Sequence, residues 1–325
     1  MEAHIADALP SDRGWQFEPK WDGFRCLAVR RGTTVSLQAK SGKALTRYFP
    51  EMVATLGALK ADDFILDGEL AVPLGKALSF DALQARLHPA QSRVRKLSVE
   101  TPSVLILFDL LRLDGRSFLD RPLSERRTAL EDFFESEAPA FSLRLSPFTR
   151  DIRVARRWLG RTGGSLDGVV AKRLDEPYRA GERAMLKVKC LRTADCVVGG
   201  FRYASGSRAV GSLLLGLYNG EGRLDHVGFT SGFAALDRKA LTKTLEALRG
   251  GSGFTGDAPG GPSRWSTERS AEWVPLKPRL VAEVRYDHVT GCRFRHGTKF
   301  LRWRPDKARC SARSIRSSLR HARRN

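Results

Sequence analysis

Apolar residues recur with strand spacing over much of the first 190 positions. Two alternating runs flank Arg31 and Gly32 and predict a β-hairpin, and later continuous apolar runs predict buried strands. Two segments instead repeat apolar residues at helical spacing, behind residues that can cap a helix. Because strands and helices do not alternate regularly, the pattern favours an α+β fold with antiparallel sheets over a doubly wound sheet. The predicted strands are 24–30, 33–39, 64–72, 104–111, 167–172 and 185–189, and the predicted helices are 124–134 and 151–159.

The pattern changes after residue 189, where short strands dominate. Asn219 and Gly220 predict a turn between two of them, and the Gly/Pro-rich stretch 250–261 predicts a loop. Several short strands and one helix within ~110 residues favour a small Greek-key barrel, with the OB-fold as the candidate. The predicted strands are 197–203, 212–218, 223–229, 280–286 and 291–295, with a helix at 236–248. We therefore expect domains at 1–190 and 191–308 and a basic, arginine-rich tail at 309–325.

The net charge of the chain indicates which kind of binding partner to expect. Hydrophobic residues make up 42% of the chain and charged residues 28%, which is typical of a globular protein. Lys and Arg number 56 against 36 Asp and Glu, a formal net charge of +20. Such a surplus favours a polyanionic partner, nucleic acid before an anionic membrane. A basic surface that serves only solubility is the alternative.

Cysteine usage and hydropathy indicate the compartment. The number of cysteines is odd and no Cys-x-x-Cys pair occurs, which argues against a disulfide framework and against structural zinc. No run of 18 apolar residues and no export signal is evident. The sequence therefore predicts a protein of the reducing cytoplasm. The five cysteines are Cys26, Cys190, Cys196, Cys292 and Cys310.

Lys20 is the first candidate for chemistry, in the run Lys20-Trp21-Asp22-Gly23. A plain turn into the hairpin is the alternative. Only about one free lysine in a thousand is neutral near pH ~7.5, since its pKa is ~10.4. A nucleophilic lysine therefore needs desolvation, nearby cations or a metal. Asp22 alone would favour the ammonium form, and it suits a nucleophile only beside a cation such as Mg²⁺.

Acidic residues mark two further strands. Glu69, in Asp67-Gly68-Glu69, is placed to accept hydrogen bonds from ribose hydroxyls or to hold a metal, unless it is simply a solvated strand end. Asp167 begins the strand that carries Lys172 five residues later. These two side chains point to opposite faces unless the intervening glycine bends the strand.

Two lysines and an aromatic residue complete the candidates of the first domain. Lys187 and Lys189 share one strand face, which costs energy unless an anion such as polyphosphate lies between them. Phe108 follows an apolar run and is either a core residue or a stacking surface for a purine. In the second domain, charge concentrates at 302–307, which alone would be an ordinary surface loop.

Six motifs occur together and in order. They are Lys-x-Asp-Gly, Asp-Gly-Glu, Phe-Asp-Leu-Leu, Asp-Gly-Val-Val-x-Lys, Lys-x-Lys and Arg-x-Asp-Lys. In this the chain resembles ATP-dependent DNA ligases of the covalent nucleotidyltransferase superfamily, most of all the small two-domain bacterial type called LigC. The resemblance runs from about Phe17 to about Lys307.

The resemblance implies an adenylation domain followed by an OB-fold, with a hinge near 190–194 between them. It also implies a reaction in three steps. Lys20 would attack the α-phosphate of ATP, AMP would pass to the 5′-phosphate of a nick in duplex DNA, and the 3′-hydroxyl would displace AMP. Mg²⁺, or Mn²⁺, would assist from Glu69 and Asp167. A DNA repair role in the bacterial cytoplasm, associated with the nucleoid, a monomeric state and a Ku-like end-joining partner are further expectations.

The resemblance also assigns individual roles. The implied catalytic residues are Lys20, Asp22, Arg25, Lys187 and Lys189. The implied contacts to ATP are Glu18, Lys20, Arg25, Glu69, Phe108, Arg183, Lys187, Lys189, Arg304 and Lys307. Arg25 would reach the ribose or the nick phosphate, and Arg304 with Lys307 would orient pyrophosphate. Lys40 and Arg302 would contact nucleic acid.

Three features depart from the pattern. Asp167 stands where many ligases carry glutamate. Lys40 stands where many carry arginine, and lysine lacks the planar bidentate fork. Only 19 residues precede Lys20, so we expect no separate DNA-binding domain.

Two alternatives to a DNA ligase remain. An RNA ligase or GTP-using capping-type enzyme is the alternative activity, and a non-catalytic DNA-binding protein is the alternative class.

Overall fold

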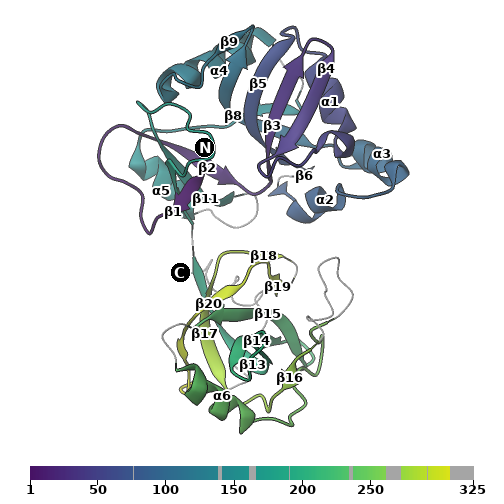
Figure 1. Ribbon diagram of the computed structural model, residues 1–325, viewed down its shortest axis with the longest axis vertical. Helices are drawn as coiled ribbons and strands as arrows, with labels where there is room; N and C mark the ends of the chain where they lie inside the picture. Colours follow the sequence, from purple (N-terminus) through teal and green to yellow (C-terminus); the bar gives the residue numbers. More distant parts are fainter. Residues whose placement is uncertain are drawn as a thin grey trace. The chain divides into compact units, whose positions relative to one another are not determined.

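The chain divides into two compact units, Met1–Cys190 and Leu191–Asn325 (Figure 1). The computed structural model describes residues 1–75, 77–137, 141–160, 166–189, 191–233, 237–260, 272–290 and 292–307. The arginine-rich tail predicted at 309–325 lies outside the described residues. None of the described helices is long and apolar enough to cross a membrane.

A six-stranded sheet forms the larger part of the first unit (Figure 1). The predicted hairpin at Arg31-Gly32 is confirmed, since β3 and β4 pair antiparallel. The continuous apolar runs form the central strands, where Leu66, Leu70 and Leu107 are fully buried. The strands, in spatial order, are β10 (Leu143–Leu145), β8 (Val104–Leu113), β5 (Asp63–Ala71), β3 (Phe24–Arg31) and β4 (Thr34–Ala39), with β9 (Arg116–Ser117) paired to β8.

Helices cover this sheet. The predicted helix at 124–134 is confirmed as α4 (Leu123–Glu137), and its apolar residues Leu130 and Phe133 join the core of the sheet. Figure 1 shows α1 beside β4 and α4 beside β8. Four further elements were not predicted, namely η1 (Thr46–Tyr48), α1 (Pro50–Gly57), α2 (Phe80–Ala85) and α3 (Gln91–Glu100), and β6 (Pro73–Leu74) with β7 (Ala77–Leu78) makes a small ribbon.

A four-stranded sheet completes the first unit. Its order is β1 (Ala3–Ile5), β12 (Met185–Val188), β11 (Leu166–Arg173) and β2 (Trp15–Trp21). Helix α5 (Ile152–Gly160), predicted at 151–159, packs against β2 and β11 through Ala155. Lys20 therefore lies near the end of a strand, and Asp22 and Gly23 form the bend that leads from β2 into the hairpin.

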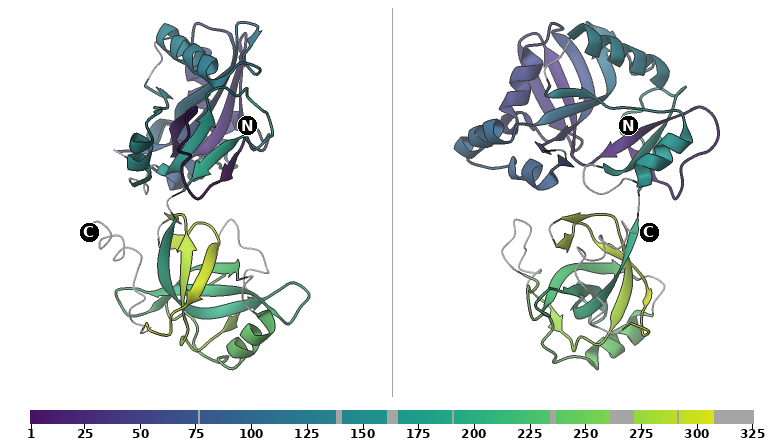
Figure 2. Two further views of the ribbon diagram at one scale, coloured as in Figure 1. Left: turned by 90° about the vertical axis from the view of Figure 1, so that its left-hand side faces the viewer. Right: turned by 180° about the vertical axis from the view of Figure 1, so that it is seen from behind.

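The second unit is a closed barrel, and the predicted OB-fold is confirmed (Figure 2). Its strands run in the order β13 (Arg192–Tyr203), β14 (Val210–Tyr218), β15 (Leu224–Gly232), β20 (Thr298–Trp303) and β17 (Val281–Tyr286), and β17 returns to β13. Helix α6 (Arg238–Glu246) begins behind Asp237, whose side chain caps it. The shorter strands are β16 (Val274–Pro275), β18 (Val289–Thr290) and β19 (Arg293–Phe294).

Two predictions about the second unit need correction. Strand β20 covers Arg302 and Trp303, where a surface loop was the alternative, because its residues pair with β17. The segment 190–194, at which the resemblance implies a hinge, overlaps β13 from Arg192 onward, since Arg192 is already paired with Tyr286 in the barrel.

Candidate active site

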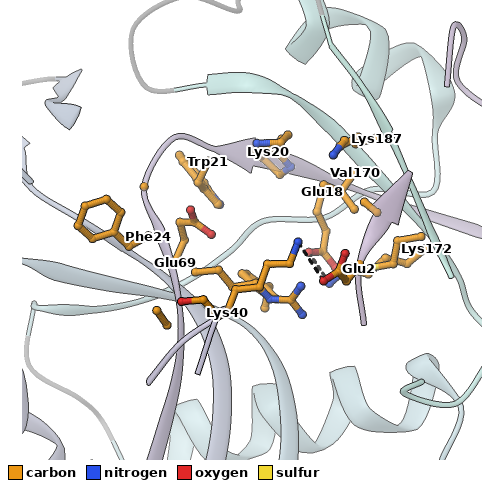
Figure 3. Close-up of a pocket in the computed structure, with 18 of the residues that line it drawn as sticks. Glu2, Glu18, Lys20, Trp21, Phe24, Lys40, Glu69, Val170, Lys172 and Lys187 are labelled. Atoms are coloured by element: carbon orange, nitrogen blue, oxygen red, sulfur yellow. Dashed lines mark ion pairs between the residues drawn. The ribbon is translucent and has the colours of Figure 1, made fainter. Parts of the chain in front are cut away.

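The first unit contains a pocket of about 800 Å³ lined by residues of both its sheets (Figure 3). Strand β2 contributes Glu18 and Lys20, and β12 contributes Lys187. Arg25, Glu69 and Phe108 come from three strands of the six-stranded sheet. The pocket thus brings together these six residues, all of which the sequence singled out.

The register of the four-stranded sheet places its charged residues on one face. Glu18 lies opposite Val170 on β11, and Val170 lies opposite Lys187 on β12. Lys20 comes two residues after Glu18, so both point to the same side. All four residues line the pocket. Strand geometry alone therefore gathers a carboxylate and two lysines there.

A β-bulge adds Asp167 to this group. The register of β11 against β2 shifts between Leu166 and Gly168, so Asp167 is the extra residue. Without the bulge, alternation would turn Asp167 away from the face of its neighbours. Its Oδ2 lies 2.7 Å from Lys20 Nζ and 3.0 Å from Lys189 Nζ. The sequence predicted that Asp167 and Lys172 share a face only if the glycine between them bends the strand, and the register shift at this position shows such an irregularity.

Gly168 allows the bulge. Its φ is +152°, and a Cβ added there would lie 2.2 Å from the carbonyl oxygen of Val188. Only glycine permits this close approach of β11 to β12.

The cations around Asp167 change the ionisation of their neighbours. Burial alone would raise the pKa of Asp167, but Lys20 and Lys189 outweigh burial and hold that pKa below its ordinary value. Burial lowers the pKa of Lys187, and the charges of Lys20 and Lys189 lower it further. The lysines repel one another, so a phosphate anion bound among them would relieve that repulsion.

Glu69 faces the same pocket from β5. Burial raises its pKa to about 8, against the opposing charges of Lys20 and Arg25. Asp22 is itself buried and adds to the upward shift of the Glu69 pKa. The glycine between Asp22 and β3 is required, because a Cβ on Gly23 would lie 2.2 Å from the carbonyl oxygen of Leu70.

A buried ion pair forms another wall. Lys172 Nζ lies 2.8 Å from Glu18 Oε2, and both side chains are almost fully buried. Gln16 donates to the other carboxylate oxygen at 2.9 Å. Lys172 Nζ also lies 4.7 Å from the centre of the Phe108 ring. Lys172 belongs to a motif that the sequence singled out, but no role was predicted for it. Its position five residues after Asp167 was the pattern that could have pointed to this residue.

The other predicted residues of the first unit are placed near the rim. Lys40 lines the pocket and pairs with Glu2 at 3.1 Å (Figure 3). Arg183 is exposed and outside the described lining of the pocket, and its charge lowers the pKa of Glu2 after the larger effect of Lys40.

The predicted residues of the barrel are engaged within it. Arg304 Nη1 lies 3.0 Å from Asp195, and Nη2 lies 2.8 Å from Asp306. These hydrogen bonds and charges raise the pKa of Arg304. Arg302 Nε lies 2.6 Å from a carboxylate oxygen of Glu283. Lys307 is exposed, and its main-chain N–H donates to the Arg304 carbonyl at 3.2 Å.

A pocket that two lysines face from one sheet, in an α+β unit joined to an OB-fold, is the arrangement expected of a nucleotidyltransferase. A family model described as the ATP dependent DNA ligase domain matches residues 2–189, and one described as the ATP dependent DNA ligase C terminal region matches residues 206–307. The chain therefore belongs to the ATP-dependent DNA ligases, enzymes that use ATP to join DNA.

Curated relatives and a solved structure agree with this family. The chain is 45% identical over 310 residues to DNA ligase C2 of Mycolicibacterium smegmatis, covering 90% of this chain and 87% of the relative. It is 43% identical over 323 residues to DNA ligase C of Mycobacterium tuberculosis, covering 94% and 90%. A solved Lig E DNA ligase, 16% identical, shares the fold with a TM-score of 0.59 over 94% of this chain and 99% of that one. The resemblance to the small LigC type is thus confirmed.

Proposed function

We propose that Lys20 carries AMP as a covalent lysyl adenylate and that the surrounding residues bind ATP and the nick. The observation that carries this proposal is the position of Lys20 on the wall of the 800 Å³ pocket, with Lys187 on the same face and Asp167 at 2.7 Å. Phosphoryl transfer depends chiefly on positioning and on neutralising charge, which this arrangement supplies.

The three steps follow from this placement. Lys20 Nζ attacks the α-phosphorus, an N–P bond forms, and the bond to pyrophosphate breaks. An oxygen of the 5′-phosphate at the nick then attacks the same phosphorus and breaks the N–P bond. The 3′-hydroxyl oxygen finally attacks the 5′-phosphorus, forms the phosphodiester and releases AMP. Lys187 and Lys189 neutralise the charge on the α-phosphate in the first two steps.

The proton on Lys20 must leave before the first attack, because only the neutral amine is a nucleophile. Asp167 is a weak proton acceptor, since its pKa lies below its ordinary value. It is better suited to orient Lys20 than to deprotonate it. The cationic charge of Lys187 and Lys189 near Lys20 favours loss of the proton.

The nucleoside would lie against the opposite walls. Phe108 offers a ring face for the adenine, and the buried pair of Glu18 and Lys172 fixes the neighbouring edge. Glu69 is placed to accept a hydrogen bond from a ribose hydroxyl. In the barrel, Arg304 and Lys307 would orient the pyrophosphate of ATP, and Arg302 would contact DNA.

The carboxylates fit Mg²⁺. Glu69 has a pKa raised to about 8 by burial, so a divalent cation beside it would restore the carboxylate. The described residues contain no cluster of three or more side chains able to hold a metal ion. Mg²⁺ takes one or two carboxylates and completes its shell with water and substrate phosphates. Glu69 and Asp167 would hold it, and it would neutralise phosphate charge.

We further propose a repair role that includes end joining. A relative named multifunctional non-homologous end joining protein LigD, of Mycobacterium bovis, is 32% identical over 308 residues, covering 90% of this chain but 36% of that protein. A Ku-like partner would bring DNA ends to a monomeric ligase. Co-purification with such a partner on DNA ends, compared with nicked circles, tests this role.

The test of Lys20 uses α-labelled ATP and Mg²⁺ with the purified chain, analysed on a denaturing gel. Wild type is expected to retain label, and Lys20→Ala is expected to retain none and to seal no nicks. Lys60→Ala, an exposed lysine outside the pocket, is the matched control and should label like wild type. Pyrophosphate treatment beforehand removes AMP already bound. Label on Lys20→Ala equal to wild type would overturn the proposal.

Removing the charge of Glu2 is expected to tighten DNA binding. Glu2 pairs with Lys40 at 3.1 Å, so it competes with a DNA phosphate for that lysine. Because both side chains are partly exposed, Glu2→Gln should raise affinity for nicked duplex DNA only about two- to fivefold at low salt. Glu100→Gln breaks an exposed pair with Lys96 on α3 and is the control. Equal affinities for wild type and Glu2→Gln in a fluorescence anisotropy titration would contradict a DNA role for Lys40.

A further inference from the structure

Arg25 is held by protein acceptors on most of its guanidinium. Its Nε–H donates to Asp67 Oδ1 at 3.0 Å, and one Nη2–H donates to Asp67 Oδ2 at 2.6 Å. The second Nη2–H donates to the hydroxyl of Tyr178 at 3.1 Å, and Nη1 donates to the carbonyl of Met1. A guanidinium has five N–H groups. Within the described residues, the recorded bonds leave one Nη1–H for a substrate.

Tyr178 connects both members of this pair. Its hydroxyl accepts from Arg25 and donates to Asp67 Oδ2 at 2.8 Å, while Asp67 itself is fully buried. Burial and the charge of Asp67 raise the pKa of Tyr178, so the phenol remains a neutral donor. The hydroxyl thus fixes the rotation of the guanidinium about the Asp67 carboxylate.

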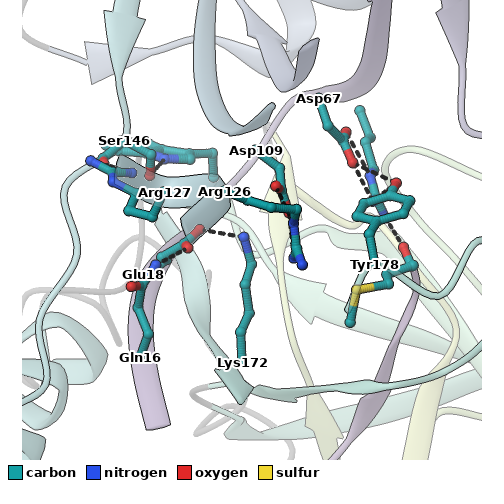
Figure 4. A network of polar contacts seen from close by, with 12 residues as sticks. Gln16, Glu18, Asp67, Asp109, Arg126, Arg127, Ser146, Lys172 and Tyr178 are labelled. Atoms are coloured by element: carbon teal, nitrogen blue, oxygen red, sulfur yellow. Dashed lines mark hydrogen bonds and ion pairs between the residues drawn. The ribbon is translucent and has the colours of Figure 1, made fainter. Parts of the chain in front are cut away.

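The segment that carries Tyr178 is itself anchored. The main-chain N–H of Tyr178 donates to the Leu119 carbonyl at 2.8 Å. Arg126 donates to the Glu176 carbonyl at 3.1 Å, and its guanidinium lies 5.7 Å from the centre of the Tyr178 ring. Figure 4 shows Tyr178 and Asp67 on the same side of the buried Asp109–Arg126 pair. The contacts of its main chain and of its ring with Arg126 therefore fix the position of the Tyr178 hydroxyl.

Arg25 lies in a wall shared by two pockets. It lines the 800 Å³ pocket with Lys20, and it also lines a second pocket of about 390 Å³ with Tyr178 and Arg31. Lys40 belongs to both linings. The rotation of the guanidinium therefore decides which side receives its remaining N–H.

We propose that Tyr178 is a positioning residue for Arg25: its hydroxyl aims the one remaining N–H of Arg25 at a phosphate or ribose oxygen of the substrate. This inference rests on the proposed function and on the contact of Arg25 with the ribose or the nick phosphate that the family resemblance implies. Without the hydroxyl, an Nη2–H loses its acceptor and Asp67 loses a donor. The guanidinium then reorients to satisfy both, and the donor no longer meets the substrate oxygen.

The test is a double-mutant cycle on the single-turnover rate of nick sealing. Tyr178→Phe is expected to slow sealing about tenfold, the loss of one hydrogen bond to a charged group. In an Arg25→Gln background, Tyr178→Phe is expected to change the rate less than about twofold, because the group on which it acts is gone. Tyr48→Phe, which removes a hydroxyl from a tyrosine outside both pockets, should leave the rate unchanged.

Three measurements separate the outcomes. Circular dichroism and thermal melting of each variant verify folding, and the cycle compares ratios within folded pairs. A tenfold loss from Tyr178→Phe both in the wild-type background and in the Arg25→Gln background would show a merely structural role and overturn the inference. So would a Tyr178→Phe rate equal to wild type. Failure of the proposed function is distinct, since wild type itself would then take no label at Lys20.

Discussion

Gly168→Ala is expected to destabilise the first unit by about 3–5 kcal/mol and to abolish nick sealing. The new Cβ would lie 2.2 Å from the carbonyl oxygen of Val188, and the φ of +152° is one that alanine rarely adopts. Strands β11 and β12 must separate to admit the methyl group. The bulge that brings Asp167 to Lys20 and Lys189 would be lost with them.

Urea unfolding and covalent labelling with α-labelled ATP measure this effect. Gly160→Ala is the matched control, because nothing lies within 4 Å of a Cβ at that position and the residue ends α5. The control should be neutral to slightly stabilising, as alanine favours a helix over glycine. A Gly168→Ala protein with wild-type stability and labelling would show that the close contact of β11 and β12 does not constrain the site.

Arg126→Met is expected to lower the free energy of unfolding by about 3–5 kcal/mol, because it leaves the carboxylate of Asp109 buried without its partner. The two side chains are 1% and 3% exposed and form two hydrogen bonds, at 2.8 and 3.1 Å. Arg126 also donates to the carbonyls of Arg121 and Glu176, which would lose a donor.

An exposed pair provides the contrast. Lys96→Met breaks the ion pair with Glu100 on α3, where both side chains are more than half exposed, and should cost less than about 0.5 kcal/mol. Replacing Asp109 by leucine together with Arg126→Met removes both charges and should recover part of the loss. If Arg126→Met and Lys96→Met shifted the urea midpoint equally, burial of the Asp109 pair would not be what stabilises this region.

The sequence predicted the strands better than the helices of the first unit. The central strands β5 and β8 are long and continuously apolar, so their runs of apolar residues stand out from the more polar loops around them. Helix α1 buries only Met52 and Leu56. Two buried residues give too little helical periodicity for the helix to be predicted from the sequence. Its position depends on tertiary contacts instead, since Glu51 pairs with the buried Arg86 at 2.7 Å.

Strand β1 illustrates the same limit. Its three residues, Ala3 to Ile5, are too few for their alternation to be recognised, yet Ala3 pairs in parallel with Met185 on β12. Glu2 is placed by the same pairing, because the N–H of Met185 donates to its carbonyl at 3.1 Å. A contact between residues about 180 positions apart leaves no local pattern in the chain. The ion pair of Glu2 with Lys40 could therefore not be predicted from the sequence.

The candidate site was predictable where strand alternation places it. Period-two spacing predicted that Lys187 and Lys189 share a face, but strand β2, which carries Glu18 and Lys20, was not predicted, and only its pairing with β11 brings these residues to Lys187. The meeting of Asp167 with Lys20 depends on a bulge, whose register the sequence does not specify. Arg25 forms hydrogen bonds with Asp67 and Tyr178, which lie on two other segments of the chain. Only the folded structure reveals these hydrogen bonds.

In the proposed reaction a single lysine, Lys20, carries the nucleotide. The test is to incubate the protein with ATP and Mg²⁺, digest it without acid treatment and map the peptides by mass spectrometry. We expect one AMP on the peptide that contains Lys20, removed by pyrophosphate and absent from Lys20→Ala. AMP on a peptide that contains Lys172, Lys187 or Lys189 instead would contradict it.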